Sequence, residues 1–314
     1  MTVSSVASGY DGVSLLAGNI AYVPAVRGVF AGGNTGAGSV NVIDYVNINT
    51  LGNAADFGDL TFARYGAAGC SSSTRGLFGG GDVGGDSYAN YIDYITIASA
   101  GNAIDFGDLT VARSYISACS SSTRGLWAGG YNGSNSNVID YVTIASTGNA
   151  TDFGDLTITR YAPAGCSSSP RGLFGGGDSG SNSNVIDYIT IASTGNATDF
   201  GDLSVARSAL ASCSSSTRGL FGGGYTGSNS NVIDYVTIAS TGNATDFGDL
   251  TVSRYGQSGC SSSSRGLFGG GNAGSASNVI DYVTISTVGN STDFGDLTTA
   301  RYYTAGLSDG HGGL

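Results

Sequence analysis

Five cysteines are the side chains in this sequence best able to do chemistry, because a thiolate can act as a nucleophile or bind a soft metal ion. Each lies at the same place in a repeated segment, and Leu307 lies there in the last copy. A metal site needs converging ligands such as C-x₂-C pairs, which the sequence lacks. Equivalent positions are also too far apart for the roughly 4.4–6.8 Å Cα span of a disulfide. We therefore predict buried free thiols at Cys70, Cys119, Cys166, Cys213 and Cys260.

The chain has one histidine, His311, in the segment Asp309-Gly310-His311-Gly312. A Ser-His-Asp site needs one serine and one acid paired with the histidine, and nothing in the sequence singles out a serine. We expect His311 to be a turn residue in the closing strand, and we expect no catalysis and no cofactor. Calcium loops of the D-x-[DN]-x-[DN]-G type do not occur. We predict no metal site, although a lone surface calcium at residues 82–86 remains an alternative.

The cysteines belong to a tandem repeat. The triplet Ile-Asp-Tyr occurs six times, and each copy leads into an Asp-Phe-Gly-Asp-Leu run. The first two copies are 93 − 44 = 49 residues apart, and the others follow at 47. A fixed period in this range indicates a propeller, a solenoid or an array. The central residues of the triplets are Asp44, Asp93, Asp140, Asp187, Asp234 and Asp281.

One unit, residues 218–264, divides into four predicted strands and shows no helical periodicity. Residues 219–224 are an apolar run ending in glycines, 231–238 are β-branched and aromatic, and 245–252 carry the Asp-Phe-Gly-Asp-Leu run. Residues 255–262 are nearly all small. Four antiparallel strands in about 47 residues are typical of a propeller blade. Because the centre of a propeller is crowded, the small-residue strand should be innermost (strand A), and the other three should follow outward in chain order as strands B, C and D.

The unit resembles a kelch repeat. The resemblance rests on Gly223-Gly224 after strand B, Val232 with Tyr235 in strand C, and Phe247-x-x-Leu250 followed by Arg254. It implies an all-β, six-bladed kelch-like β-propeller over residues 27–314. Two departures are phenylalanine where kelch repeats have tryptophan, and a longer C–D hairpin. The near-identical copies and their Asn-Val-Ile-Asp-Tyr-Val-Thr-Ile phrase also resemble kelch-like repeat proteins of marine tailed phage virions.

Ring closure can also be predicted. Six sets of strands B, C and D exist, but only five A strands lie between them. Residues 301–308 match 64–71 at Arg, Tyr, Ala, Gly and Ser, whereas residues 20–26 do not, so the C-terminal strand should close the first blade. Residues 1–26 then form an N-terminal arm, which either packs along the propeller or attaches the protein to a neighbour, including a second copy of the chain. The framework phenylalanines should be buried between blades; they are Phe57, Phe106, Phe153, Phe200, Phe247 and Phe294.

Charge in this sequence is mostly part of the framework. All 12 basic residues are arginine and all 23 acids are aspartate, giving a net charge of −11. The arginine after each strand D should pair with a framework aspartate, and the planar guanidinium suits bidentate pairing. The acidic balance argues against nucleic-acid binding, which needs clustered cations. The sequence contains no run of around 18 apolar residues, so it predicts no membrane span. No basic residue precedes Arg27, so the charged start of a signal peptide is missing. We therefore expect a soluble protein.

The units differ most in two loops that should lie on one face of the propeller. One loop follows strand B, and the other follows the strand-D arginine. The residue types in the two loops are complementary, because a blade with tyrosine in one loop has Asp, Asn or Ser in the other. Each blade thus offers one tyrosine, which either fills rim space or forms a recognition face, since Tyr-rich surfaces suit sugar rings and protein partners. These residues are Tyr65, Tyr131, Tyr161, Tyr225, Tyr255 and Tyr302. The longest B–C loop, residues 82–91, adds the candidate residues Asp82, Asp86, Tyr88 and Tyr91.

The sequence therefore favours a non-enzymatic structural or adhesion module. The phage resemblance implies a virion protein of a tail, fibre or decoration, with another virion protein or a host glycan as the partner. A cellular kelch-like scaffold or lectin is the alternative. A propeller enzyme would need a metal or carboxylate constellation that the sequence lacks.

Overall fold

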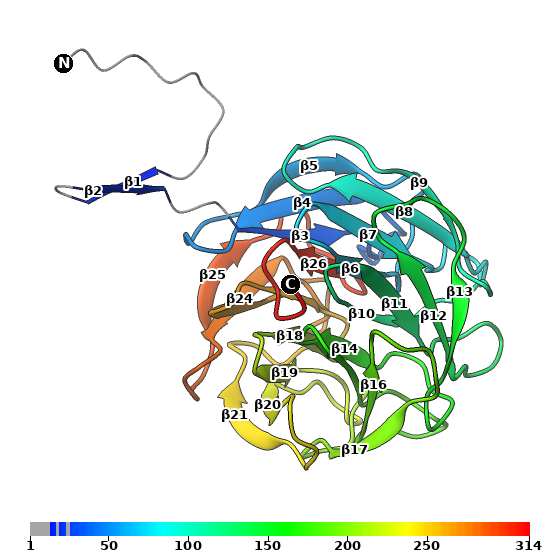
Figure 1. Ribbon diagram of the computed structural model, residues 1–314. Coiled ribbons are helices and arrows are strands. Elements are labelled where there is room, and N and C mark those ends of the chain that lie inside the picture. The colour runs from blue at the N-terminus through cyan, green and yellow to red at the C-terminus, as the bar shows by residue number, and fades with distance from the viewer. Residues whose placement is uncertain (1–12, 17–18, 23–25) are drawn as a thin grey trace.

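The computed structural model describes residues 13–16, 19–22 and 26–314. Six four-stranded antiparallel sheets are arranged around one axis as the blades of a β-propeller (Figure 1). The described residues include no helix, and therefore none long and apolar enough to cross a membrane. The predicted all-β, six-bladed architecture is confirmed.

In each blade a four-residue strand lies at the axis, and three longer strands follow outward. From the axis, blade 1 contains β26 (Ala305–Ser308), β3 (Arg27–Ala31), β4 (Val42–Asn47) and β5 (Ala55–Asp59); blade 2 contains β6 (Ala68–Ser71), β7 (Arg75–Gly79), β8 (Tyr91–Thr96) and β9 (Ile104–Asp108). Blade 3 contains β10 (Ser117–Ser120), β11 (Arg124–Ala128), β12 (Val138–Thr143) and β13 (Thr151–Asp155); blade 4 contains β14 (Ala164–Ser167), β15 (Arg171–Gly175), β16 (Val185–Thr190) and β17 (Thr198–Asp202). Blade 5 contains β18 (Ala211–Ser214), β19 (Arg218–Gly222), β20 (Val232–Thr237) and β21 (Thr245–Asp249); blade 6 contains β22 (Ser258–Ser261), β23 (Arg265–Gly269), β24 (Val279–Thr284) and β25 (Thr292–Asp296).

The C-terminal strand closes the ring as predicted. β26 pairs with β3 in the register Ala305↔Ala31 to Ser308↔Gly28, so the first blade takes its inner strand from the end of the chain. The competing N-terminal segment forms a separate hairpin of β1 (Val13–Leu16) and β2 (Asn19–Tyr22), which pair only with each other. The rest of the predicted arm, up to residue 25, lies outside the described residues.

The longer C–D hairpin has a structural role, because it covers the outer edge of the preceding blade. In blade 2 the backbone amides of Gly101 and Ala103 donate to the carbonyls of Phe57 and Asp59 on β5. The same hydrogen bonds recur around the ring. In the last of them, the Gly52 amide of blade 1 donates to the Phe294 carbonyl of blade 6. Each outermost strand therefore has a partner on its otherwise open edge, which blocks edge-to-edge aggregation.

Buried ion pairs join each blade to the next. Arg64, after β5, contacts Asp93 on β8 at 2.9 Å, and both side chains are at most 1% exposed. All six predicted arginine–aspartate pairs form, and Arg301 with Asp44 completes the ring. The expected bidentate geometry is wrong: one guanidinium nitrogen meets the carboxylate and also donates to a backbone carbonyl, that of Phe78 in the case of Arg64. The other carboxylate oxygen accepts the hydroxyl of a residue such as Thr61.

The second arginine series makes a further contact between blades. Arg75 lies 4.6 Å from the centre of the Tyr94 ring and donates from Nη1 to the carbonyl of Ile144 in the following blade. All six copies repeat both contacts. The twelve arginines are thus all engaged within the propeller, which accounts for their fixed repeat positions.

The hydrophobic cores lie between blades. Phe57 of blade 1 packs in one cluster with Phe78 and Ile95 of blade 2. The six framework phenylalanines are 2–3% exposed, which confirms their predicted burial. The five cysteines are buried and free, also as predicted. They fill the space over a glycine of the next blade: a Cβ added to Gly125 would lie 2.6 Å from the Sγ of Cys70.

Candidate functional site: the tyrosine face and the axial channel

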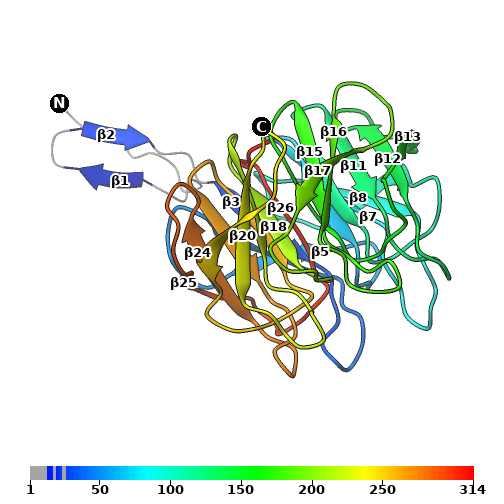
Figure 2. The same cartoon turned by 90° about the horizontal axis from the view of Figure 1, so that it is seen from below.

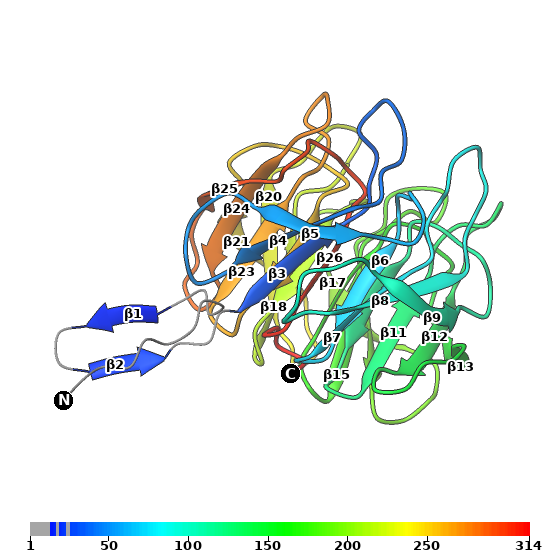
Figure 3. The same ribbon diagram turned by 90° about the horizontal axis from the view of Figure 1, so that it is seen from above.

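The two variable loops of each blade meet on one face. In blade 2, Tyr65 and Asp82 form an antiparallel bridge, with backbone hydrogen bonds in both directions. Equivalent bridges join the predicted partners in the other blades, from Ser114 with Tyr131 to Asn34 with Tyr302. The complementary residue types in the sequence are therefore direct neighbours. Figure 3 shows the β3–β4 and β7–β8 loops projecting from the face opposite the C-terminus.

The tyrosines of this face form one connected network, which we call the tyrosine face. Ring contacts run from Tyr88 through Tyr131 to Tyr161 on one side and from Tyr225 to Tyr255 on the other. Centroids of neighbouring rings lie 4.8–6.5 Å apart, mostly edge to face, the geometry that aromatic pairs prefer. The network contains all six repeat tyrosines and Tyr88. Its nine members are Tyr65, Tyr88, Tyr115, Tyr131, Tyr161, Tyr225, Tyr255, Tyr302 and Tyr303.

The rings remain partly open to solvent. Tyr225 is 41% exposed, and the other five repeat tyrosines are partly exposed. Burial raises the pKa of Tyr65, Tyr161 and Tyr255 above the usual tyrosine value. These hydroxyls therefore stay protonated at neutral pH and can both donate and accept hydrogen bonds.

The other candidate residues occupy different environments. Asp82 is 1% exposed, accepts the Tyr65 hydroxyl at 3.1 Å and the Gly84 amide at 2.6 Å, and so holds Tyr65 in place. Asp86 is exposed at the loop tip with φ of 57°. Tyr91 lies apart from the network and stacks on the exposed Phe62, with ring centres 5.1 Å apart.

The sequence reasoning missed two tyrosines at the centre of the face. Tyr115 and Tyr303 follow the predicted variable position by one residue and adopt φ of 52° and 54°. The equivalent residues elsewhere are Gly66, Ala162, Ala209 and Gly256. The backbone amide of each of these six residues donates to the carbonyl of its counterpart in the preceding blade, so the six hydrogen bonds form a closed ring around the axis. The Gly66 amide donates to Tyr303, and the Tyr303 amide donates to Gly256. The left-handed conformation is energetically costly for a tyrosine. The sequence signal that could have identified these two positions is a large residue where two other copies have glycine.

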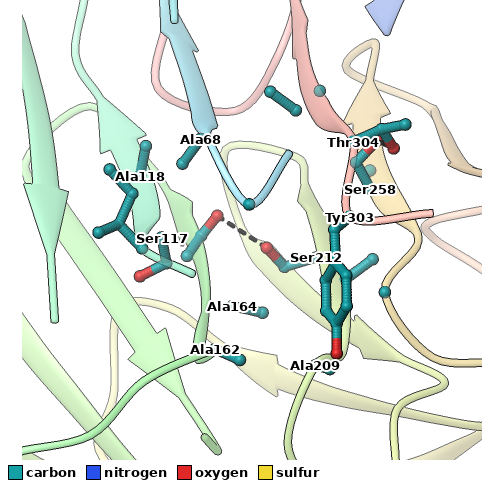
Figure 4. A pocket seen from close by; sticks show the side chains of 18 of the residues that line it. Ala68, Ser117, Ala118, Ala162, Ala164, Ala209, Ser212, Ser258, Tyr303 and Thr304 are labelled. Atoms are coloured by element: carbon teal, nitrogen blue, oxygen red, sulfur yellow. Dashed lines mark hydrogen bonds between the residues drawn. The ribbon is translucent and has the colours of Figure 1, made fainter. Parts of the chain in front are cut away.

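An axial channel lies beneath this ring. Its upper part is a cavity of about 100 Å³ lined by glycine, alanine and serine of the inner strands, with Tyr115 and Tyr303 at its mouth. Figure 4 shows Ser117, Ser212 and Ser258 around the cavity and the Tyr303 ring extending toward Ala209. A lower part of about 50 Å³ continues to His311. The channel has room for ordered water, which needs roughly 10–15 Å³ per molecule on this measure.

The cysteines, the side chains best able to do chemistry, are buried, and His311 is partly buried. Burial raises the pKa of Cys166 to about 12 and that of Cys70 well above its usual range, so these thiols are not nucleophilic. Within the described part of the chain, no group of three His, Cys, Asp or Glu side chains could hold a metal ion. His311 lies in a turn, as expected, but this turn follows β26 and is not part of the closing strand.

These features define the class of protein as a six-bladed β-propeller with a tyrosine-rich face. No protein-family model matches the chain, and no curated protein matches it.

Proposed function

We propose that this protein is a non-enzymatic binding module whose tyrosine face docks a protein or a glycan. The observation that carries the proposal is the connected network of partly exposed, uncharged tyrosines on one face. Aromatic rings offer large contact area at low conformational cost, and the hydroxyls supply hydrogen bonds at the rim. The blades behind the face are held by ion pairs, cation–π contacts and paired outer edges, so the face is rigid before a partner arrives, and little entropy is lost on binding.

The geometry of the chain ends supports an attachment role for residues 1–26. Val26 leads into β3, whose first residues pair with the end of β26, so the chain enters the propeller on the C-terminal face. That face is opposite the tyrosine face (Figures 2 and 3). An arm attached there would point the tyrosines away from the anchor, as suits an adhesion module.

The finer identity we propose is a kelch-type virion protein of a tailed phage, with another virion protein or a host surface glycan as the partner. The support is the resemblance of the repeat phrase to phage kelch-like proteins. A cellular kelch-like scaffold or lectin is the alternative. Phage structural genes beside this gene would favour the virion, and a glycan array with the isolated protein distinguishes sugar binding from protein docking.

The binding face is tested by Tyr131→Ala and Tyr225→Ala. If the rings contact a partner, each substitution should weaken binding by about 2 kcal/mol, roughly thirty-fold, while the melting temperature changes little. Leu51→Ala is the matched control, because Leu51 is an exposed apolar residue in the C–D hairpin, away from the tyrosine face. If both tyrosine variants melt early and bind normally, the rings serve packing and the proposed face is wrong.

A further inference from the structure

The C-terminal segment, residues 309–314, enters the end of the axial channel opposite the tyrosine face. Figure 1 shows the C-terminus at the centre of the ring. The Arg27 amide donates to Oδ1 of Asp309 at 2.8 Å, which fixes the segment to the start of β3. The Gly312 amide donates to the Ser214 carbonyl at 3.1 Å. A Cβ added to Gly312 or Gly313 would collide with backbone carbonyl oxygens of Ser215 or Ser120, so only glycine fits at these two positions.

The last residues of the inner strands form a serine ring at this end. The ring consists of Ser71, Ser120, Ser167, Ser214, Ser261 and Ser308. Five of the hydroxyls donate to the carbonyl of the preceding serine, at 2.6–2.8 Å. At the sixth junction His311 is inserted: its Nε2 lies 3.2 Å from the Ser71 carbonyl and 3.2 Å from the Ser120 hydroxyl. One histidine thus replaces one link of a six-membered ring.

The hydrogen bonds of His311 require a neutral imidazole. Nδ1 accepts the backbone amide of Gly313 at 3.0 Å and therefore carries no proton. Nε2 then holds the single ring proton and donates to the Ser71 carbonyl. A second proton would have to sit on Nδ1, where it would oppose the Gly313 amide hydrogen. Protonation therefore breaks the contact that folds the segment back onto His311.

We propose that residues 309–314 are a proton-sensitive plug of the axial channel, seated while His311 is neutral and released when the imidazole takes up a second proton. Release opens the channel end and frees the Asp309 contact at the start of blade 1.

No charged group in the surroundings favours the imidazolium. The groups that face the ring are the Ser71 carbonyl, the Ser120 hydroxyl and the Gly313 amide. The neighbouring inner-strand cysteines keep their thiols protonated, since burial raises their pKa. The other ionisable side chain of the plug, Asp309, accepts the Arg27 amide, and burial raises its pKa.

The direction of the pH effect follows from burial, which lowers the pKa of His311 from 6.5 to about 4. Through His311 the seated plug binds fewer protons than the released plug, and this contribution is constant above about pH 6.5. As pH falls from 6.5 to 4, the His311 contribution lowers the ratio of seated to released plug about tenfold per unit, and below about pH 4 it levels off at roughly 300-fold. Burial raises the pKa of Asp309, so protonation of that carboxyl acts in the opposite direction and favours seating.

The experiment is an NMR titration of the intact protein. His311 is the chain's one histidine, so its imidazole signals report this site alone. The ¹⁵N heteronuclear NOE of Gly312 and Gly313 reports whether the plug is ordered. We expect His311 to titrate well below pH 6.5 and the two glycines to become mobile over the same pH range. Trp127 fluorescence serves as the control: if it does not change over this pH range, the blades stay folded.

Two variants separate the histidine from other acid effects. In His311→Gln the side chain cannot titrate. The heteronuclear NOE values of Gly312 and Gly313 in this variant should therefore not fall between pH 7 and pH 3.5. Asp309→Asn keeps an acceptor for Arg27 and removes the opposing titration of Asp309, so it should still release as His311 becomes protonated. The proposal is overturned if the wild-type glycines stay rigid after His311 is protonated, if His311 titrates near 6.5, or if the Gln variant becomes disordered over the wild-type range.

Discussion

The clearest test of the architecture is to remove one carboxylate from the ion pairs between blades. Asp187 in blade 4 lies 2.8 Å from Arg160, which follows the outer strand of blade 3, and both side chains are fully buried. Burial lowers the pKa of Arg160, and the Asp187 carboxylate opposes that shift. The same carboxylate accepts the Thr157 hydroxyl at 2.6 Å and the Thr157 amide at 3.2 Å.

Asp187→Ala should therefore destabilise the protein strongly. It leaves a buried guanidinium without its counter-charge, which typically costs about 3–5 kcal/mol. The orphaned Thr157 amide can add about 1–3 kcal/mol. Since folded domains are stable by only about 5–15 kcal/mol, the variant should lose a large share of its free energy of unfolding.

Urea denaturation followed by the fluorescence of Trp127, the one tryptophan, measures the change in the free energy of unfolding. Asp199→Ala is the matched control, because Asp199 lies exposed on β17 of the same blade and should change stability by no more than about 0.5 kcal/mol. The double variant Arg160→Met with Asp187→Leu should be less destabilised than Asp187→Ala, since it leaves no unpaired charge. A cost for Asp187→Ala equal to that of the control would refute the role of these pairs.

Two further predictions concern the core and the closure of the ring. Phe200→Ala should cost about 3–5 kcal/mol by urea denaturation, because Phe200 is 2% exposed between blades, and a negligible loss would contradict the assignment of the core. Deletion of residues 301–314 removes β26 and Arg301 and bares the inner edge of β3, so the protein should open and aggregate in size-exclusion chromatography with light scattering; a stable monomer would disprove closure by this strand.

The features that repeat six times could be predicted from the sequence. Six copies of Ile-Asp-Tyr indicate the number of blades, and the order of residue sizes indicates the order of strands. The match of residues 301–308 to 64–71 identifies the closing strand. The arginine–aspartate pairing is also predictable, because each position recurs with its partner. Its single-nitrogen geometry is not, since that depends on where the backbone carbonyl of Phe78 and its counterparts lie.

The features that occur once or twice escaped prediction for the same reason. Tyr115 and Tyr303 stand where two other blades have glycine, and a sequence pattern cannot show that a bulky residue adopts a positive φ there. His311 has no counterpart in any other unit, so the sequence alone indicates only a turn residue. Its role depends on a break in the serine ring, which only the folded channel creates.

The distribution of charge bears on how a partner would be bound. Every arginine is engaged inside the propeller, whereas each outer strand exposes an aspartate such as Asp199 without a neighbouring surface cation. The outer rim is therefore acidic, and the tyrosine face also carries carboxylates, among them the exposed Asp86 and the partly exposed Asp178. An anionic partner would gain no long-range attraction from such surfaces, so its association would depend on short-range contact of rings and hydroxyls. The acidic rim would at the same time repel polyanions approaching from the side. If the proposed docking function holds, such a face would suit neutral glycans and neutral or basic protein surfaces better than anionic ones.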